Sequence, residues 1–287
     1  MVAFRICVLQ QESGGKKNLN KAKKCFLGFT KKYKDSLALG VQAFSRVGRM
    51  TYEANPKRNR KDALKHFASA LDTYGKLVES KADKGVAKYY AAQAAFYSAE
   101  YLYTDFGKIN LTKKSMKKIE LLKETITQKA ESLAAADTAF NDIFATYKEP
   151  QWNAAALFRI GLLYYEFRDM LLEAPVPEKL PYEVQDAYRA HLETTAEPVE
   201  KKALTAFGYA LRLAHEQRVY NSWSKKSGEF ASKVNPDEFP IHSEDKVGHE
   251  HTKDTLTAAS FVRILKRGDI AVDMVKGVEA KSGKGNK

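Results

Sequence analysis

The feature that most constrains this chain is a helical pattern that recurs four times. An alanine is followed four positions later by a phenylalanine, and further core positions come seven and eleven residues after the alanine. In a helix of about 3.6 residues per turn these positions lie on one face. The recurrence predicts amphipathic helices stacked as repeated units, an architecture that usually binds other proteins. The copies are Ala22/Phe26/Phe29/Tyr33, Ala63/Phe67/Ala70/Tyr74, Ala136/Phe140/Ile143/Tyr147 and Ala203/Phe207/Ala210/Ala214.

A second pattern lies between these helices. A small residue is followed four positions later by a tyrosine, in Gly48/Tyr52, Ala99/Tyr103 and Gly161/Tyr165. A small residue lets a neighbouring helix approach closely, and a tyrosine one turn later covers the seam. The chain therefore alternates a first-type helix with Gly/Ala and Tyr and a second-type helix with Ala and Phe.

Together the two patterns resemble the tetratricopeptide repeat (TPR), whose first helix carries Gly or Ala with tyrosines and whose second carries Ala, a large aromatic and Ala. Strand signals are sparse, and the resemblance covers roughly residues 20–235. It implies an all-α fold, a right-handed TPR-like helical-repeat solenoid with a degenerate C-terminal cap and a flexible tail. The matching residues are Gly161, Tyr164 and Tyr165, then Ala63, Phe67 and Ala70, with helix-ending prolines in Asn55-Pro56 and Asn235-Pro236.

The spacing departs from that family. The alanines at 22, 63, 136 and 203 are 41, 73 and 67 residues apart, whereas the usual repeat is about 34 residues long. Long insertions are therefore expected around 107–130 and 174–200. Another kind of helical bundle is the alternative architecture.

The segment Ala22–Tyr52, with its Tyr33-Lys-Asp-Ser36 turn, is more narrowly similar to TPR proteins of the bacterial cell envelope. These include the periplasmic coordinator of the Tol–Pal system, the lipoprotein of the β-barrel assembly machine and TPR proteins of gliding motility, of which the motility type fits best. This resemblance implies a periplasmic or envelope location if the chain is part of a longer exported protein, and a cytoplasmic one otherwise.

The sequence predicts three segments: a flexible basic N-terminal segment at 1–18, a TPR-like domain at 19–235, and a linker, possible capping element and tail at 236–287. Apolar residues within 255–280 allow either a capping helix or a hairpin. The helix containing Cys25 is of the second type without a preceding partner, so we expect the chain to be part of a longer repeat protein. Cys25 is expected to be a small packed residue, and no pairing with Cys7 follows from the sequence.

Positive charge is concentrated at the start of the chain. The formal net charge is +13, and residues 1–60 hold 14 Lys/Arg against 3 Asp/Glu. Such a patch attracts acidic proteins, anionic lipid headgroups or nucleic acid. No nucleic-acid-reading motif is present, so nucleic acid is an unlikely partner, and this part of the chain supplies the alternative function of nucleic-acid or anionic-surface binding.

The sequence offers little chemistry for an enzyme. It has no phosphate-binding glycine loop, nucleophile elbow or triad order, and no apolar stretch of about 18 residues for a transmembrane helix. His242, His249 and His251 cluster in a polar segment without a scaffold to fix their geometry, so no metal site is expected. We therefore expect no catalytic residue and no cofactor, and an enzyme built on a helical bundle remains the third functional class.

The TPR resemblance implies that partner contacts come from first-type helices around the small residue. Aromatic residues there would anchor a partner, and the two arginines would take acidic side chains or a terminal carboxylate. The alternative is that these aromatics are only core. The candidate residues are Gln42, Arg49, Tyr52, Gln93, Phe96, Tyr103, Phe158, Arg159 and Tyr165.

Overall fold

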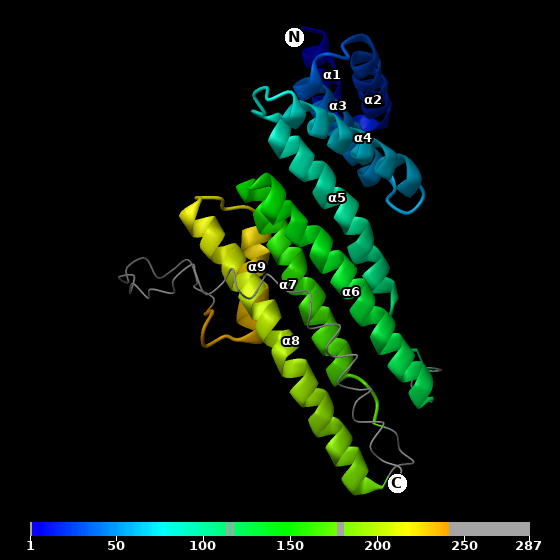
Figure 1. Ribbon diagram of the computed structural model, residues 1–287, viewed down its shortest axis with the longest axis vertical. Coiled ribbons are helices and arrows are strands. Elements are labelled where there is room, and N and C mark those ends of the chain that lie inside the picture. The colour runs from blue at the N-terminus through cyan, green and yellow to red at the C-terminus, as the bar shows by residue number, and fades with distance from the viewer. Residues whose placement is uncertain (1, 113–114, 116–117, 177–180, 241–287) are drawn as a thin grey trace. The chain divides into compact units, whose positions relative to one another are not determined.

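The computed structural model describes residues 2–112, 115, 118–176 and 181–240, and these form helices joined by turns (Figure 1). No strand occurs in those ranges, so the expected all-α class is confirmed. The helices are α1 Val2–Glu12, α2 Gly15–Lys32, α3 Leu37–Ala54, α4 Arg60–Glu79, α5 Ala87–Lys108, α6 Ile119–Tyr147, α7 Pro150–Leu172, α8 Tyr182–Glu216 and α9 Ser222–Val234.

Prolines and glycines mark several helix boundaries. Pro56 and Pro236 each follow a helix end by two residues, and Pro150 begins α7, where its missing N–H costs no hydrogen bond. Gly14 and Gly15 have φ angles of 63° and 73°, a conformation that glycine adopts without strain, and they form the turn between α1 and α2. The breaks between helices therefore follow from local sequence.

The two expected insertions largely lengthen second-type helices. Helix α6 has 29 residues and α8 has 35, and they begin at Ile119 and Tyr182, inside the segments 107–130 and 174–200. Pro198 lies within α8 on an exposed position, where the backbone acceptor that it leaves without an intrahelical donor can bond to water.

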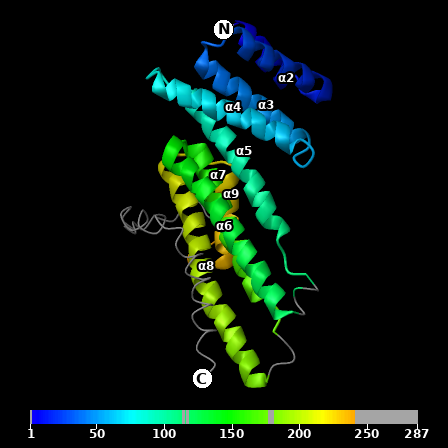
Figure 2. The same cartoon turned by 45° about the vertical axis from the view of Figure 1, so that its right-hand side comes forward.

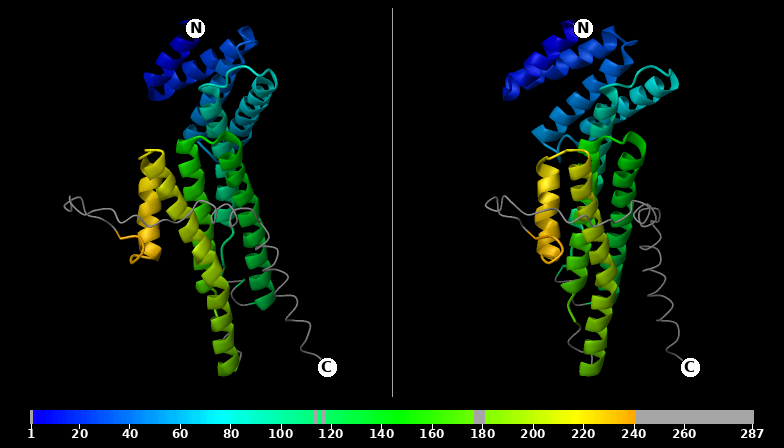
Figure 3. Two further views of the ribbon diagram at one scale, coloured as in Figure 1. Left: turned by 60° about the vertical axis from the view of Figure 1, so that its left-hand side comes forward. Right: turned by 90° about the vertical axis from the view of Figure 1, so that its left-hand side faces the viewer.

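The chain divides into two compact units. Unit 1 comprises Met1–Tyr101 with Ile143–Asn153, and unit 2 comprises Leu102–Asp142 with Ala154–Lys287. The division falls inside the 19–235 segment that we expect to be one repeat domain. In unit 1, α3 packs against α2 and α4 (Figure 2). In unit 2, α8 packs along α9 (Figure 3).

Each unit contains a contact between a first-type glycine and a second-type phenylalanine. A Cβ placed on Gly48 of α3 would lie 2.5 Å from the ring of Phe67 in α4. A Cβ on Gly161 of α7 would lie 2.3 Å from the ring of Phe207 in α8. Both rings are fully buried. Only glycine lets the two helices close over the ring in this way, because any side chain would overlap it.

The first residues of the chain correct our expectation of a flexible segment at 1–18. Residues 2–12 form α1, and α2 already begins at Gly15. Phe4 of α1 packs edge-on against Phe26 and Phe29 of α2, with ring centroids 5.3 and 5.1 Å apart. Apolar residues lie on both sides of α1, so the sequence shows no clear amphipathic pattern there, and burial of one side against α2 stabilises the helix. A helix thus precedes the first second-type helix, although it lacks the Gly–Tyr pattern.

Cys25 packs against the core as expected, but it is also covalently paired, which the sequence did not indicate. Cys7 of α1 and Cys25 of α2 form a disulfide whose Cα atoms are 5.4 Å apart. The pairing could not be derived from the sequence because it depends on α1 being a helix packed on α2. The bond closes a loop of 18 residues, which by chain entropy stabilises the folded state by about 3 kcal/mol.

No helix in the described ranges is both long and apolar enough to cross a bilayer. The possible capping element at 255–280 and the histidines 242, 249 and 251 lie outside the described residues.

Substitution of Gly48 by alanine is expected to lower the free energy of unfolding by about 1–3 kcal/mol, because the new methyl overlaps the Phe67 ring. Gly28 of α2 is the matched control, since an added Cβ there meets no atom within 4 Å. Gly28→Ala should raise stability by about 0.4–1 kcal/mol. Urea unfolding of both variants measures the difference, and equal effects would show that the close approach at Gly48 is absent.

Joint replacement of Cys7 and Cys25 by serine is expected to lower the free energy of unfolding by about 3 kcal/mol. Urea unfolding with and without a reductant provides the measurement. Reductant should destabilise the unsubstituted chain and leave the variant unchanged. Two titratable thiols in the oxidised, folded protein would contradict the disulfide.

Candidate partner-binding surfaces

The nine candidate residues are divided between the two units. Unit 1 contains Gln42, Arg49, Tyr52, Gln93 and Phe96, whereas unit 2 contains Tyr103, Phe158, Arg159 and Tyr165. Each unit therefore presents its own candidate surface.

Three of the nine are core residues, and their assignment to a partner-binding groove is corrected. Gln93, Phe96 and Phe158 expose only 2 %, 1 % and 2 % of their surface. The Gln93 side chain accepts a hydrogen bond of 2.9 Å from Ser45, and the Phe96 ring packs against Trp152 at 5.3 Å. The positions expected to face a groove are covered because α5 and α7 are packed on more than one side.

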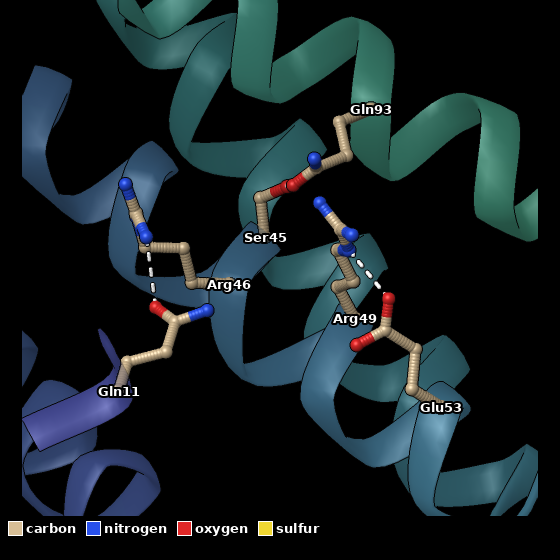
Figure 4. Close-up of polar contacts among 6 residues, drawn as sticks. All are labelled: Gln11, Ser45, Arg46, Arg49, Glu53 and Gln93. Atoms are coloured by element: carbon tan, nitrogen blue, oxygen red, sulfur yellow. Dashed lines mark hydrogen bonds and ion pairs between the residues drawn. The ribbon is translucent and has the colours of Figure 1, made fainter. Parts of the chain in front are cut away.

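In unit 1 the polar face of α3 carries Arg46 and Arg49 (Figure 4). Arg46 donates hydrogen bonds to Gln11 at 2.8 Å and to the Tyr90 hydroxyl at 2.6 Å, and its guanidinium lies over the Tyr90 ring. With its amide oxygen turned toward them, Gln42 accepts from Tyr90 at 3.0 Å and from Arg46 at 3.2 Å. Sequence reasoning missed Arg46, although it stands one helical turn after Gln42.

The Arg49 side chain is 43 % exposed. It donates to Glu53 at 2.7 Å, and its guanidinium lies 5.9 Å from the centre of the Tyr97 ring. Tyr52 packs against the same Tyr97 ring at 5.0 Å. The Trp152 ring also packs against Tyr97, with ring centroids 5.9 Å apart. The resulting surface, which we call the α3 arginine face, consists of Gln42, Arg46, Arg49, Tyr52 and Tyr97.

In unit 2 the counterpart is Arg159 of α7. Its guanidinium lies 4.4 Å from the centre of the Tyr103 ring and 5.3 Å from the Trp223 ring. The Tyr103 hydroxyl donates to Glu166. Tyr165 packs edge-on against Phe230 of α9 at 5.5 Å. These half-buried aromatics both support the helix packing and leave an edge at the surface.

Unit 2 also contains a pocket of about 380 Å³. Lys129 lies at its wall, fully buried, and donates to the carbonyl oxygen of Phe106 at 2.8 Å. Burial lowers the pKa of Lys129. No sequence pattern indicated this pocket, because its walls come from separate helices. Its lining residues are Asn110, Leu111, Lys129, Glu166, Asp169, Met170 and Glu173.

A half-buried polar network joins three helices of unit 2. The Tyr164 hydroxyl of α7 donates to Asp137 of α6 at 3.2 Å, and Lys202 of α8 reaches that hydroxyl at 3.4 Å. Burial raises the pKa of the Asp137 carboxyl and lowers that of the Lys202 ammonium, because it disfavours both charged forms. The network fixes the register of the helices and is paired within itself.

Within the described residues, no group of three or more His, Cys, Asp or Glu side chains is placed to hold a metal ion.

Comparison with protein-family models, with curated proteins and with solved structures gives no match to this chain.

Substitution of Asp137 by asparagine is expected to change the pH dependence of stability. The folded-state pKa of Asp137 lies above the unfolded value of about 3.9, so the folded chain binds this proton more tightly. The contribution of Asp137 to the unfolding free energy therefore rises as the pH falls from its folded-state pKa toward its unfolded-state pKa.

The gain in unfolding free energy of Asp137→Asn over the unsubstituted chain should be greatest at neutral pH and should shrink upon acidification. The measurement is urea unfolding of both proteins across a pH series. Their unfolding free energies should approach each other as the pH falls. A relative gain that grows on acidification would mean that the pKa of Asp137 is depressed.

Proposed function

We propose that this chain is a non-enzymatic scaffold that binds a protein or peptide through the surfaces of its first-type helices. The α3 arginine face carries the proposal. It combines Arg and Tyr, two of the residue types most enriched among the side chains that dominate protein–protein binding energy. The resemblance to the TPR family and the right-handed solenoid it implies belong to the same proposal, which the Gly48–Phe67 and Gly161–Phe207 contacts support.

The partner segment is acidic or ends in a carboxylate. Arg49 forms a partly exposed ion pair with Glu53, one helical turn away, and lies near the Tyr97 ring. Such a pair contributes about 0.3–0.5 kcal/mol, so a partner carboxylate can replace Glu53 at little cost. Arg46 is held more firmly by Gln11 and Tyr90, and its ordered guanidinium loses little side-chain entropy when a partner binds.

Arg159 of unit 2 supports a second contact of the same kind. Stacking on Tyr103 and Trp223 keeps the guanidinium extended and desolvates one of its faces. A guanidinium stacked on aromatic rings keeps its positive charge and can attract an acidic group. A partner with two acidic segments would therefore engage one surface in each unit.

The proposed setting is a bacterial cell-envelope or motility assembly, the periplasm being the compartment that the narrower resemblance favours. The disulfide between Cys7 and Cys25 supports this setting, because disulfides form and persist in oxidising compartments.

Nucleic-acid or anionic-surface binding by the basic first sixty residues is the second candidate. The observation in its favour is the row of exposed lysines along α2, including Lys16, Lys17, Lys21 and Lys24. Binding of this kind weakens steeply with salt and is indifferent to sequence.

Joint replacement of Arg46 and Arg49 by alanine is expected to weaken partner binding roughly tenfold to a hundredfold, because both guanidinium contacts are lost. The partner is identified first by affinity capture from the native lysate, with and without nuclease, and its affinity is then measured with purified protein. Lys57→Ala with Arg58→Ala is the matched control, since both side chains are exposed and the charge change is the same.

Unchanged affinity of the Arg46/Arg49 variant, with an unfolding midpoint close to that of the control, would remove the α3 arginine face as the binding site. Captured material that disappears after nuclease would favour the nucleic-acid candidate. Arg159→Ala, measured in the same way, tests the surface of unit 2.

A further inference from the structure

Helix α1 exposes an aliphatic stripe on the side opposite its core contacts. Val2, Ile6 and Leu9 are spaced by four and three residues, so they share one helix face. They expose 76 %, 49 % and 53 % of their surface. The other face of α1 buries Phe4, Cys7 and Val8. A helix that is apolar on both sides is normally covered on both sides.

The stripe lies in the most basic part of the chain. Residues 2–34 contain nine Lys/Arg and one Asp/Glu. Arg5 is exposed on the same face of α1 as the stripe, and α2 exposes lysines from its first turn onward. The chemistry that complements this surface is apolar and negatively charged at once.

We propose that α1 docks on an anionic lipid surface. The side chains of Val2, Ile6 and Leu9 enter the boundary between headgroups and acyl chains, and Arg5 with the α2 lysines contacts lipid phosphates. Short aliphatic insertion and cationic contacts reinforce each other in helices that lie in the plane of a membrane. The stripe would hold the scaffold against the membrane while the α3 arginine face binds a partner.

Two other occupants fit the surface less well. A second copy of this chain would bring two strongly positive segments together, which charge repulsion opposes. The core of a protein interface is typically enriched in aromatic residues and methionine, and the stripe has neither. A lipid boundary needs no such shape complementarity.

The disulfide makes the stripe a fixed feature of unit 1. Because Cys7 is bonded to Cys25, α1 cannot roll over to bury Ile6 and Leu9 without breaking that bond or leaving α2. The inner face of α1 therefore stays packed on the core, and its outer face stays exposed.

The experiment measures co-sedimentation of the full chain with phosphatidylcholine vesicles that contain or lack phosphatidylglycerol. The test variant is Ile6→Asp with Leu9→Asp. The matched control is Val86→Asp with Val184→Asp, because these valines are also exposed and the charge change is the same. A second test variant, Ile6→Ser with Leu9→Ser, removes apolar area without adding charge and covers the case in which the aspartates perturb α1.

The expected result is binding to the vesicles that contain phosphatidylglycerol and none to those that lack it, and salt should weaken this binding. Both stripe variants should bind roughly tenfold more weakly, whereas the control variant should bind nearly as well as the unsubstituted chain. Equal loss in test and control variants, or no binding to these vesicles, would overturn the proposal. So would a dimer in solution that the stripe variants dissociate, which would identify a second copy as the occupant. Binding to soluble polyglutamate that the serine variant weakens to the same degree would identify an acidic protein instead.

This inference uses none of the residues of the α3 arginine face. A failure of vesicle binding therefore leaves the protein-binding proposal standing, and the reverse also holds.

Discussion

The close contact of a glycine with a phenylalanine ring is the constraint on which the helix pairs depend. Gly48 receives Phe67 in unit 1, and Gly161 receives Phe207 in unit 2, with no room for a Cβ at either glycine. Because the ring replaces the missing side chain, the two backbones approach closely and the ring is fully buried. Each ring also contributes the largest transfer free energy available to a side chain of its helix, about 2–3 kcal/mol. The remaining apolar contacts of each pair can form only at this separation.

That constraint is visible in the sequence, and so the helical class and most helix positions could be predicted. Glycine and phenylalanine at fixed offsets within apolar periodicity specify which faces meet. Helix α1 could not be predicted in the same way, because its stability comes from Phe4 packing on Phe26 and from a disulfide, both of which act at a distance along the chain. A sequence pattern predicts a helix only when the residues of that helix themselves show amphipathic spacing or strong helix propensity.

The candidate surfaces show a similar division between local and long-range information. Arg49, Arg159 and Tyr165 lie at partly exposed positions, but Gln93 and Phe158 are buried. Helical periodicity places a residue on a face, and it does not tell whether a later helix covers that face. Helix α9 does so for Phe158, whose ring packs against Trp223 and Phe230. Arg46 went unrecognised for the converse reason, because its partners Gln11 and Tyr90 come from helices remote in sequence.

The outer faces of the first and last described helices differ in character. Helix α9 buries small residues such as Ser227 and Ala231, satisfies the Ser227 hydroxyl internally, and turns lysines and a glutamate outward. It also begins with a capping box between Asn221 and Ser224, which satisfies backbone groups at its exposed start. A polar outer face of this kind can face water. Helix α1 has the opposite character, since its outer face is aliphatic. Exposed aliphatic side chains are unfavourable in water, which is the reason for our proposal that the outer side of α1 is a binding surface.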